Sequence, residues 1–212
     1  MFQKYCELYT VNKTLENIIL AFLETSLAEW TAVLAGILYV ILISYRMISA
    51  WFFALVSALV YVYLCYTSNL FLETGLQFFY VIMAIYGWFK WNKESSEKEG
   101  LITRWTIKAH AINISLSTFL FLSLGFVFDN YTSQANPYTD AFSTVFSLGA
   151  TYMVTKKVLE NWIYWVVIDA VCIYLFASRE LYLTAVLFFI YTLIALFGYF
   201  QWRRKFISQT IL

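Results

Sequence analysis

The sequence is poor in residues that break regular structure. Its 212 residues include only one proline and seven glycines. This scarcity of turn residues argues against a fold of many short strands. The uninterrupted apolar stretches are also longer than the roughly 9–11 residues that a membrane-barrel strand needs. Both a β-rich domain and a barrel are therefore excluded.

Charge, cysteine and histidine are scarce as well. Charged residues make up 13% of the chain and hydrophobic residues 62%, whereas a soluble domain carries about 25% charge. Cys6, Cys65 and Cys172 form no CxxC pair, which argues against a redox or disulfide role. One histidine and no cluster of cysteines or carboxylates argue against a metal site, and no cofactor is expected. Acids at Glu7 and Glu16 and the lack of a basic n-region argue against a cleavable signal peptide.

What the chain has instead is long apolar segments, most of them near the ~20 residues that cross a bilayer as a helix. An amphipathic segment over residues 1–27, with an apolar face that includes Leu15 and Ile18, precedes them. The sequence predicts an all-α membrane protein of seven transmembrane helices. The predicted spans are Ala28–Tyr45, Ala50–Tyr66, Phe71–Trp91, Thr106–Phe128, Tyr138–Thr155, Glu160–Phe176 and Tyr182–Trp202.

The distribution of Lys and Arg predicts the orientation. With seven spans, one side of the membrane holds only Lys4, Lys13 and Arg179, and the other holds the remaining 11 basic residues. The positive-inside rule places the richer side in the cytoplasm. We therefore expect a multi-pass protein of the bacterial inner membrane, with its N-terminus outside and its C-terminus in the cytoplasm.

Part of the chain is repeated. Residues 51–91 match residues 162–202 without a gap at an offset of 111 positions. The repeat predicts two like-oriented three-helix units, residues 28–92 and 138–204, joined by a flexible charged linker and a fourth helix in 93–137 and followed by a tail, 205–212. This 3+1+3 parallel repeat is the SWEET-like arrangement, in which ligands bind between the repeats. The first helices match weakly, with Glu29 and Asp140 as their best pair.

The sixth span carries the most informative polar pattern. Trp162, Trp165 and Asp169 follow i, i+3, i+7 spacing and so share one helix face. A carboxylate at this depth costs roughly 2.5–3.5 kcal/mol in lipid and should face the protein interior. Two indoles beside an acid suit a flat cation through ring stacking and cation–π attraction. Alternatively, the tryptophans are an interfacial belt and Asp169 is a packing hydrogen bond.

Other spans add candidate ligand residues. Gln77 brings an amide to mid-membrane where the other repeat has Phe188, so the symmetry is broken at a polar position; helix–helix packing is the alternative. Trp88 fits an aromatic belt as well as a site. The candidates outside the sixth span are Gln77, Tyr80, Trp88, Asn113 and Tyr191, the tyrosines being a matched pair and Asn113 sharing a face with His110.

The motif Asn161-Trp-x-x-Trp-x-x-x-Asp169 resembles the Pnu family of bacterial vitamin transporters, whose type is the nicotinamide riboside transporter PnuC. Leu76-Gln77-x-x-Tyr80 and Tyr86-Gly-Trp88-x-x-Trp91 belong to the same resemblance, which runs from about Glu29 to Arg204. It implies that Asn161, Trp162 and Trp165 contact the ligand, with Gln77 and Asp169 as polar partners.

The resemblance also implies facilitated diffusion by a homotrimer surrounded by membrane lipid, with a cytoplasmic kinase that traps the vitamin. Nicotinamide riboside is the expected small cationic vitamin, and thiamine is the alternative. A seven-helix receptor or a membrane-embedded enzyme is the alternative of another class. The last predicted span lacks the lysine of a retinal protein, no catalytic motif lies within a span, and nothing indicates nucleic-acid binding.

Overall fold

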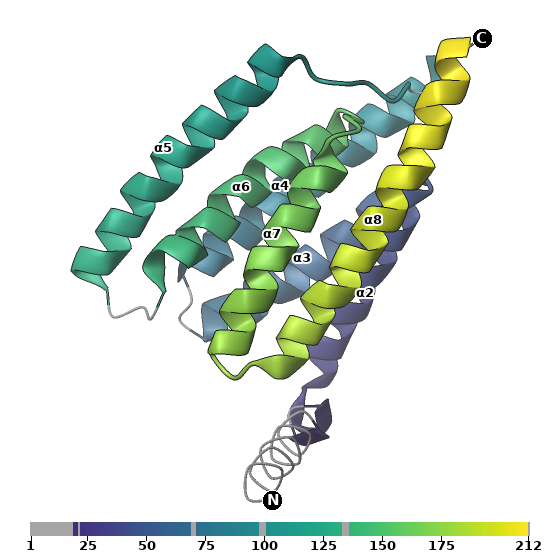
Figure 1. The fold of residues 1–212 in the computed structure, drawn as a ribbon. Coiled ribbons are helices and arrows are strands. Elements are labelled where there is room, and N and C mark those ends of the chain that lie inside the picture. The colour runs from purple at the N-terminus through teal and green to yellow at the C-terminus, as the bar shows by residue number, and fades with distance from the viewer. Residues whose placement is uncertain (1–18, 21, 69–70, 98–100, 133–135, 212) are drawn as a thin grey trace, which may run out of the picture.

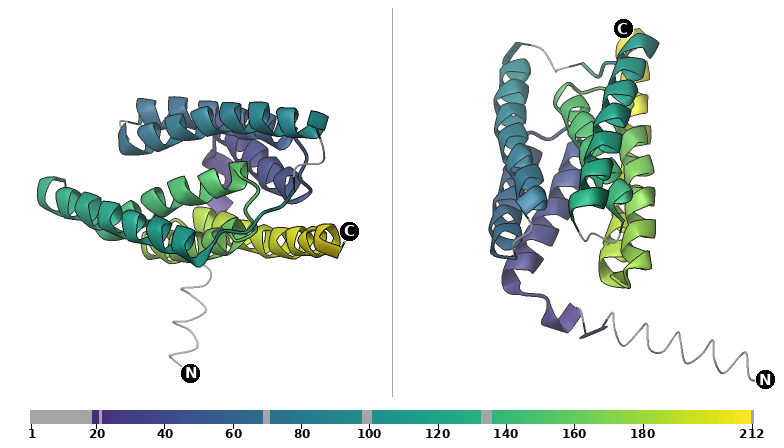
Figure 2. Two further views of the ribbon diagram at one scale, coloured as in Figure 1. Left: turned by 90° about the horizontal axis from the view of Figure 1, so that it is seen from above. Right: turned by 90° about the vertical axis from the view of Figure 1, so that its left-hand side faces the viewer.

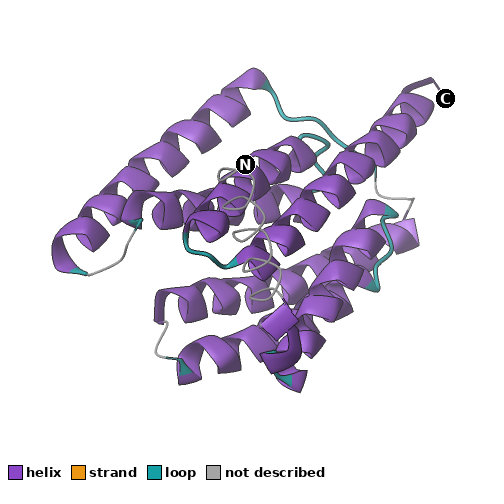
Figure 3. Ribbon diagram, turned by 60° about the horizontal axis from the view of Figure 1, so that its bottom comes forward, coloured by secondary structure: helices purple, strands orange, loops and turns teal. Residues whose placement is uncertain are grey.

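A computed structural model describes residues 19–20, 22–68, 71–97, 101–132 and 136–211. The predicted amphipathic segment 1–27 therefore lies largely outside the described residues. Every regular element in the described part is an α-helix (Figure 3), apart from one isolated bridge between Thr103 and Val158. The prediction of an all-α chain is confirmed.

Seven long helices follow one another in the described part of the chain, and local sequence signals set several of their ends. Ser26 and Glu29 form a reciprocal capping box at the start of the first helix, and Thr106 accepts a hydrogen bond from the Ala109 amide at another start. Pro137 occupies the first turn of a further helix, where it needs no hydrogen-bonded amide. The helices are α2 (Leu27–Ser44), α3 (Ala50–Thr67), α4 (Phe71–Glu97), α5 (Ile107–Tyr131), α6 (Pro137–Thr155), α7 (Asn161–Ser178) and α8 (Tyr182–Ile211).

Two helices are longer than the hydropathy pattern predicted. α4 extends past Trp91 to Glu97, so the first part of the expected flexible linker is helical. α8 extends past Trp202 through most of the expected tail. Hydropathy marks where apolar residues end, but Lys, Glu, Arg and Gln are good helix formers and continue both helices beyond that point. The α8 extension also docks: the Gln209 side chain bonds both the amide and the carbonyl of Ile102.

The helices form two layers (Figures 1 and 2). In one layer α3 contacts both α2 and α4, and in the other α7 contacts both α6 and α8. The layers meet through two matched contacts, α2 with α8 and α4 with α6, and α5 packs against α6. We call the end of the bundle that carries Arg46, Lys90, Lys156, Lys157 and Arg203 the basic end.

Five of the helices are long and apolar enough to cross a membrane: α2, α3, α5, α7 and α8. The other two, α4 and α6, contact each other where the layers meet. α6 has nine buried residues, including Ser147, Thr151 and Thr155. Polar side chains are tolerated at membrane depth when protein surrounds them, so the polarity of α6 is compatible with its position inside the bundle.

The connections after the first helix of each layer share one geometry. Arg46 and Lys157, which are 111 positions apart, both adopt positive φ, at 60° and 53°. The Met47 amide bonds the Leu42 carbonyl at 3.0 Å, and the matched Val158 amide bonds the Met153 carbonyl at 3.0 Å. The offset found in the later helices therefore extends to this connection, although the first helices show little sequence similarity.

Candidate functional site between the two layers

Asp169 is the buried acid of the site. Its residue is 3% exposed on α7, and none of the ion pairs between described residues involves it. An isolated carboxylate in a low-dielectric interior strongly favours a nearby positive charge. The expected burial of Asp169 is therefore observed, and its surroundings suit a cation.

Two tyrosines approach Asp169 from the third helix of each layer. Tyr80 on α4 and Tyr191 on α8 both lie close enough to Asp169 to interact electrostatically. The Tyr80 side chain lies next to Ser147 on α6. The Tyr191 hydroxyl lies 2.7 Å from the point where a Cβ on Gly36 of α2 would sit. Each tyrosine therefore reaches the first helix of the opposite layer, at positions 111 residues apart.

Trp165 lies one turn before Asp169 on the same face of α7. It is half-buried and packs against both apolar clusters of the core. Gln77 is half-buried on α4, three residues before Tyr80 and so on the same face. The ring of Phe188, which matches Gln77 in the repeat, instead contacts Tyr191 at 5.9 Å. Trp165, Asp169, Tyr80 and Tyr191 form the centre of the candidate site, with Gln77 beside it.

The two layers contribute unequally to this centre. The positions that match Trp165 and Asp169 are Ala54 and Ala58 in α3. An indole and an acid on one side therefore have only methyl groups as counterparts on the other. A pseudo-symmetric scaffold with so large a difference at its middle is suited to an asymmetric ligand.

Asn161 and Trp162 lie nearer the basic end. Trp162 is 1% exposed, and its ring carbons lie 2.6–2.8 Å from a Cβ built on Gly198. Asn161 is 0% exposed and donates from Nδ2 to the Val158 carbonyl at 2.6 Å, while its Oδ1 has no hydrogen-bond partner among the described residues. Described contacts place Trp162 with Trp202 rather than with the tyrosines around Asp169.

Two further predicted site residues lie away from Asp169. Asn113 on α5 packs against α6, with its Oδ1 2.7 Å from a Cβ built on Gly149, and its side chain lies near Tyr164. Trp88 is 39% exposed, and no contact among the described residues joins it to Tyr80 or Asp169. The structure therefore does not bring Asn113 and Trp88 to the centre of the site.

Sequence reasoning missed several residues around the site. Tyr39 lies near Tyr80, and Tyr61 lies near Tyr191, so each tyrosine beside Asp169 has a second tyrosine near it. Cys172 also lies within electrostatic reach of Asp169. Cys172 matches Tyr61 at the offset of 111. A comparison of the two repeats would therefore have identified both residues as candidates near Asp169 and Tyr191.

A separate polar cluster fixes the segment before α5 at the basic end. The Arg104 Nε donates to Glu160 Oε1 at 2.6 Å, and the hydrogen bond and charge of Glu160 raise the pKa of Arg104. His110 Nδ1 lies 3.0 Å from the Tyr164 hydroxyl. A hydrogen bond to Tyr86 raises the pKa of Lys156, and electrostatic interactions with Tyr152 and Tyr86 raise it further. The contact of His110 with Tyr164 ties α5 to α7, and the contacts of Lys156 with Tyr86 and Tyr152 tie the end of α6 to α4.

Comparison with known proteins identifies the chain. The profile of the nicotinamide mononucleotide transporter family matches residues 26–204. The chain belongs to this family. The resemblance seen in the motifs is therefore confirmed over nearly the whole chain, and the family consists of transporters rather than enzymes.

Individual members of the family agree with this assignment. The chain is 28% identical over 205 residues to "Nicotinamide riboside transporter PnuC" of Escherichia coli (strain K12), covering 84% of this chain and 86% of that protein. It is 25% identical over 188 residues to the protein of the same name from Haemophilus influenzae, covering 83% and 80%. The structure titled "Crystal structure of the Vitamin B3 transporter PnuC" matches with a TM-score of 0.69 at 22% identity, covering 95% of this chain and 92% of that one. The fold is shared, and the protein is a multi-pass membrane transporter.

Proposed function

We propose that this transporter carries nicotinamide riboside into the cell by facilitated diffusion. The observation that carries the proposal is Asp169, a buried acid without an ion-pair partner among the described residues, surrounded by aromatic side chains where the two layers meet. A pyridinium ring is flat and positively charged, so it suits both stacking on Trp165 and attraction to the carboxylate.

The charge of the site favours the riboside over the mononucleotide that gives the family its name. Arg and Lys are common donors to a bound phosphate. Lys157 is the one buried Lys or Arg among the described residues; it lies at the basic end with its Nζ 4.7 Å from the centre of the Trp91 ring. Asp169 would repel a phosphate at the centre. The riboside lacks that group and keeps the cationic ring.

We propose seven spans in a SWEET-like 3+1+3 arrangement, with α4 and α6 crossing the membrane beside the five more apolar helices. The matched connections at Arg46 and Lys157 and the matched contacts of α2 with α8 and α4 with α6 support the repeat. With the basic end in the cytoplasm of a bacterium, the N-terminus lies outside the inner membrane. A membrane potential negative inside would then draw the cation inward by about 2.3 kcal/mol per 100 mV.

Within the site, Trp165 stacks on the ring of the vitamin, Asp169 attracts its charge, and Gln77, Tyr80 and Tyr191 bond its ribose. Asn161 and Trp162 remain predicted ligand contacts, which the vitamin would meet on its way from the centre to the basic end, whereas Trp88 and Asn113, also predicted from the sequence, lie away from Asp169 and are not part of the proposed centre. The exposed apolar face of α5 suits lipid or neighbouring protomers of the expected homotrimer. Trapping by a cytoplasmic kinase would make the uptake unidirectional.

Radiolabelled uptake into proteoliposomes, with and without an enclosed riboside kinase, tests the function. Saturable uptake of nicotinamide riboside that equilibrates without the kinase and accumulates with it supports the proposal. Calorimetric titration with nicotinamide riboside and thiamine separates the two vitamins; binding of thiamine alone would replace the substrate. We expect Trp165→Ala to abolish saturable uptake in a protein that still folds, and unchanged uptake would remove Trp165 from the site.

A further inference from the structure

Four tryptophans form a buried cluster between the site and the basic end. Trp51, Trp91, Trp162 and Trp202 are each at most 2% exposed. Trp51 and Trp91 contact edge to face at 5.4 Å and 88°, and the matched Trp162 and Trp202 do so at 5.4 Å and 90°. Trp91 and Trp202 then meet at 6.4 Å, across the boundary between the layers. The cluster therefore joins the two halves at their common axis.

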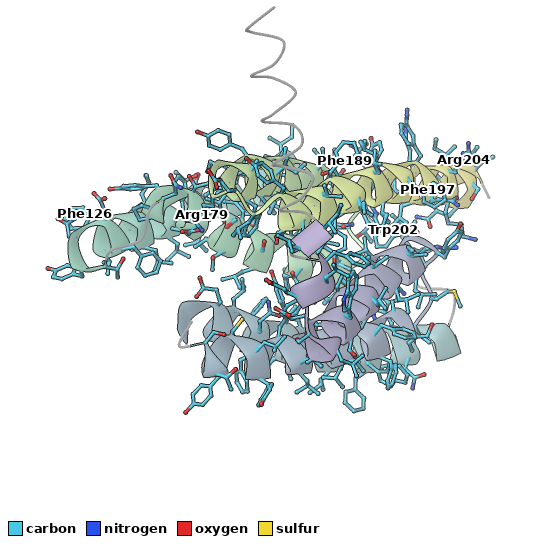
Figure 4. The ribbon with its side chains drawn as sticks, turned by 90° about the horizontal axis from the view of Figure 1, so that it is seen from below. Phe126, Arg179, Phe189, Phe197, Trp202 and Arg204 are labelled. Carbon is cyan, nitrogen blue, oxygen red and sulfur yellow. The ribbon has the colours of Figure 1, made fainter. Side chains whose placement is uncertain are left out.

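Hydrogen bonds cross the same boundary in a reciprocal pattern. Trp202 Nε1 of α8 donates to the Ile43 and Ser44 carbonyls of α2 at 3.2 and 3.1 Å. Trp91 Nε1 of α4 donates to the Thr155 carbonyl of α6 at 3.2 Å. Ser44 and Thr155 are 111 positions apart, as are the two indoles. Figure 4 shows Trp202 on the side of α8 that faces the first-layer helices.

These carbonyls are the acceptors left over at helix ends. α2 ends at Ser44 and α6 at Thr155, and the last four carbonyls of a helix have no partner within it. An indole N–H from the opposite half bonds to each helix end, where the Ile43 carbonyl also accepts from the Arg46 amide and the Thr155 carbonyl also accepts from Lys90 Nζ. Withdrawing the indoles would break these bonds and remove the Trp202 donor from the Ser44 carbonyl, so the bonds favour the state in which the layers are closed together.

The cluster also lies on the route from the site to the basic end. Trp162 precedes Asp169 by seven residues on α7, about 10 Å along the helix axis. Trp91 follows Tyr80 by eleven residues on α4, about 16 Å. A ligand at Asp169 that leaves toward the basic end must pass between the two layers, where the indoles close the boundary.

We propose that this tryptophan clasp, Trp51, Trp91, Trp162 and Trp202 with the carbonyls of Ser44 and Thr155, is the closed gate on the basic side. The gating role rests on the proposed transport function. Release of the ligand requires Trp91 and Trp202 to withdraw from the helix ends of the opposite half. Trp51 and Trp162 stay with their own halves, packed on Gly87 and Gly198.

The two seams of the clasp are built differently. At the α4–α6 seam, Lys90 Nζ also donates to the Thr155 carbonyl at 3.1 Å, and Lys156 lies 5.8 and 5.4 Å from the Tyr86 and Tyr152 ring centres. At the α2–α8 seam the position of Lys156 is taken by Tyr45, whose ring contacts Phe197 at 5.7 Å. Lysine side chains therefore reinforce the α4–α6 seam, and aromatic rings reinforce the α2–α8 seam. Because Trp202 Nε1 donates to two carbonyls, its replacement should have the larger effect, so the α2–α8 seam is the better one to test.

The test measures how often the α2–α8 seam opens. Ser44 is 2% exposed beneath Trp202, so a Ser44→Cys thiol is protected while the clasp is closed. Membrane vesicles of both orientations are treated with a membrane-impermeant maleimide, and labelling at position 44 is followed by peptide mass spectrometry, which separates it from the native cysteines. No vitamin is needed, so the readout is independent of the transported substrate.

Trp202→Phe removes two bonds across the boundary, and we expect it to speed labelling at position 44 about tenfold or more. Trp51→Phe is the matched control: it shrinks an indole of the same cluster whose Nε1 has no hydrogen-bond partner in the part of the chain that the structure describes, so it should change the rate less than twofold. Trp91→Phe, read at Thr155→Cys, repeats the test at the other seam. Acceleration from one vesicle face only would support the gate, even in a protein that fails to carry nicotinamide riboside.

Equal labelling rates in Trp202→Phe and Trp51→Phe would overturn the proposal, because the cluster would then be fixed packing rather than a gate. Acceleration from both vesicle faces would do the same, since it would mean general loosening of the bundle. Should Trp202→Phe fail to fold, the Trp91→Phe and Thr155→Cys pair decides by the same criteria.

Discussion

The sharpest prediction concerns Asp169→Asn. This change keeps the shape of the side chain and removes its charge, so it isolates the attraction between the carboxylate and a cationic ligand. For charges roughly 6 Å apart at an effective dielectric constant of about 20, the attraction is about 3 kcal/mol. We therefore expect the affinity for nicotinamide riboside to fall by about 100-fold.

A neutral analogue makes the test specific to charge. The reduced, dihydropyridine form of nicotinamide riboside has nearly the same shape but no positive charge. Uptake of both forms into proteoliposomes should show a large rise in KM for the cation and little change for the neutral form. Equal losses for the two forms would refute the electrostatic role of Asp169 and leave it a hydrogen-bonding or packing residue.

Stability supplies the control on folding. Asp169 is buried and has no ion-pair partner among the described residues, so removing its charge should not lower the free energy of unfolding of the empty protein. The thermal midpoint of Asp169→Asn in detergent should therefore equal or exceed that of the parent. A clear decrease would mean that the carboxylate holds the fold together and that transport losses are indirect.

Other changes test the packing around the site. Gly87→Ala places a methyl 2.5 Å from the buried Trp51 ring and should lower the free energy of unfolding by about 1–3 kcal/mol in thermal melts, whereas Gly75→Ala meets nothing within 4 Å and should be neutral or slightly stabilising. Gly36→Ala should push the Tyr191 hydroxyl out of place and raise the KM for uptake, while melts show a smaller change than for Gly87→Ala. Trp88→Phe should leave the KM unchanged, because Trp88 is exposed and lies away from Asp169; a raised KM would return it to the site.

The helices could be predicted from the sequence because hydropathy and length decide them in a membrane. The starts of α2, α5 and α6 fall within one residue of the predicted spans. The helices α4 and α8 continue beyond the ends of the predicted spans, because hydropathy reports where lipid ends and not where hydrogen bonding along a helix ends. A charged amphipathic continuation such as residues 203–211 remains helical in water or against protein, as the contact of Gln209 with Ile102 shows.

The candidate site, too, could be predicted only in part from the sequence. Burial of Asp169 followed from the cost of a charge in lipid, and that argument needs no knowledge of neighbouring helices. The partners of the tryptophans needed such knowledge. Trp162 and Trp165 share a helix face. Trp162 nevertheless packs on Gly198 of the neighbouring helix α8, because a glycine there leaves room for its ring. The repeat contained this information: Trp51 with Gly87 and Trp162 with Gly198 are the same pair, which indicates a packing motif present in both halves. By the same comparison Trp165 and Asp169 stand opposite alanines, so the positions where the halves differ, rather than those they share, mark where a ligand would bind.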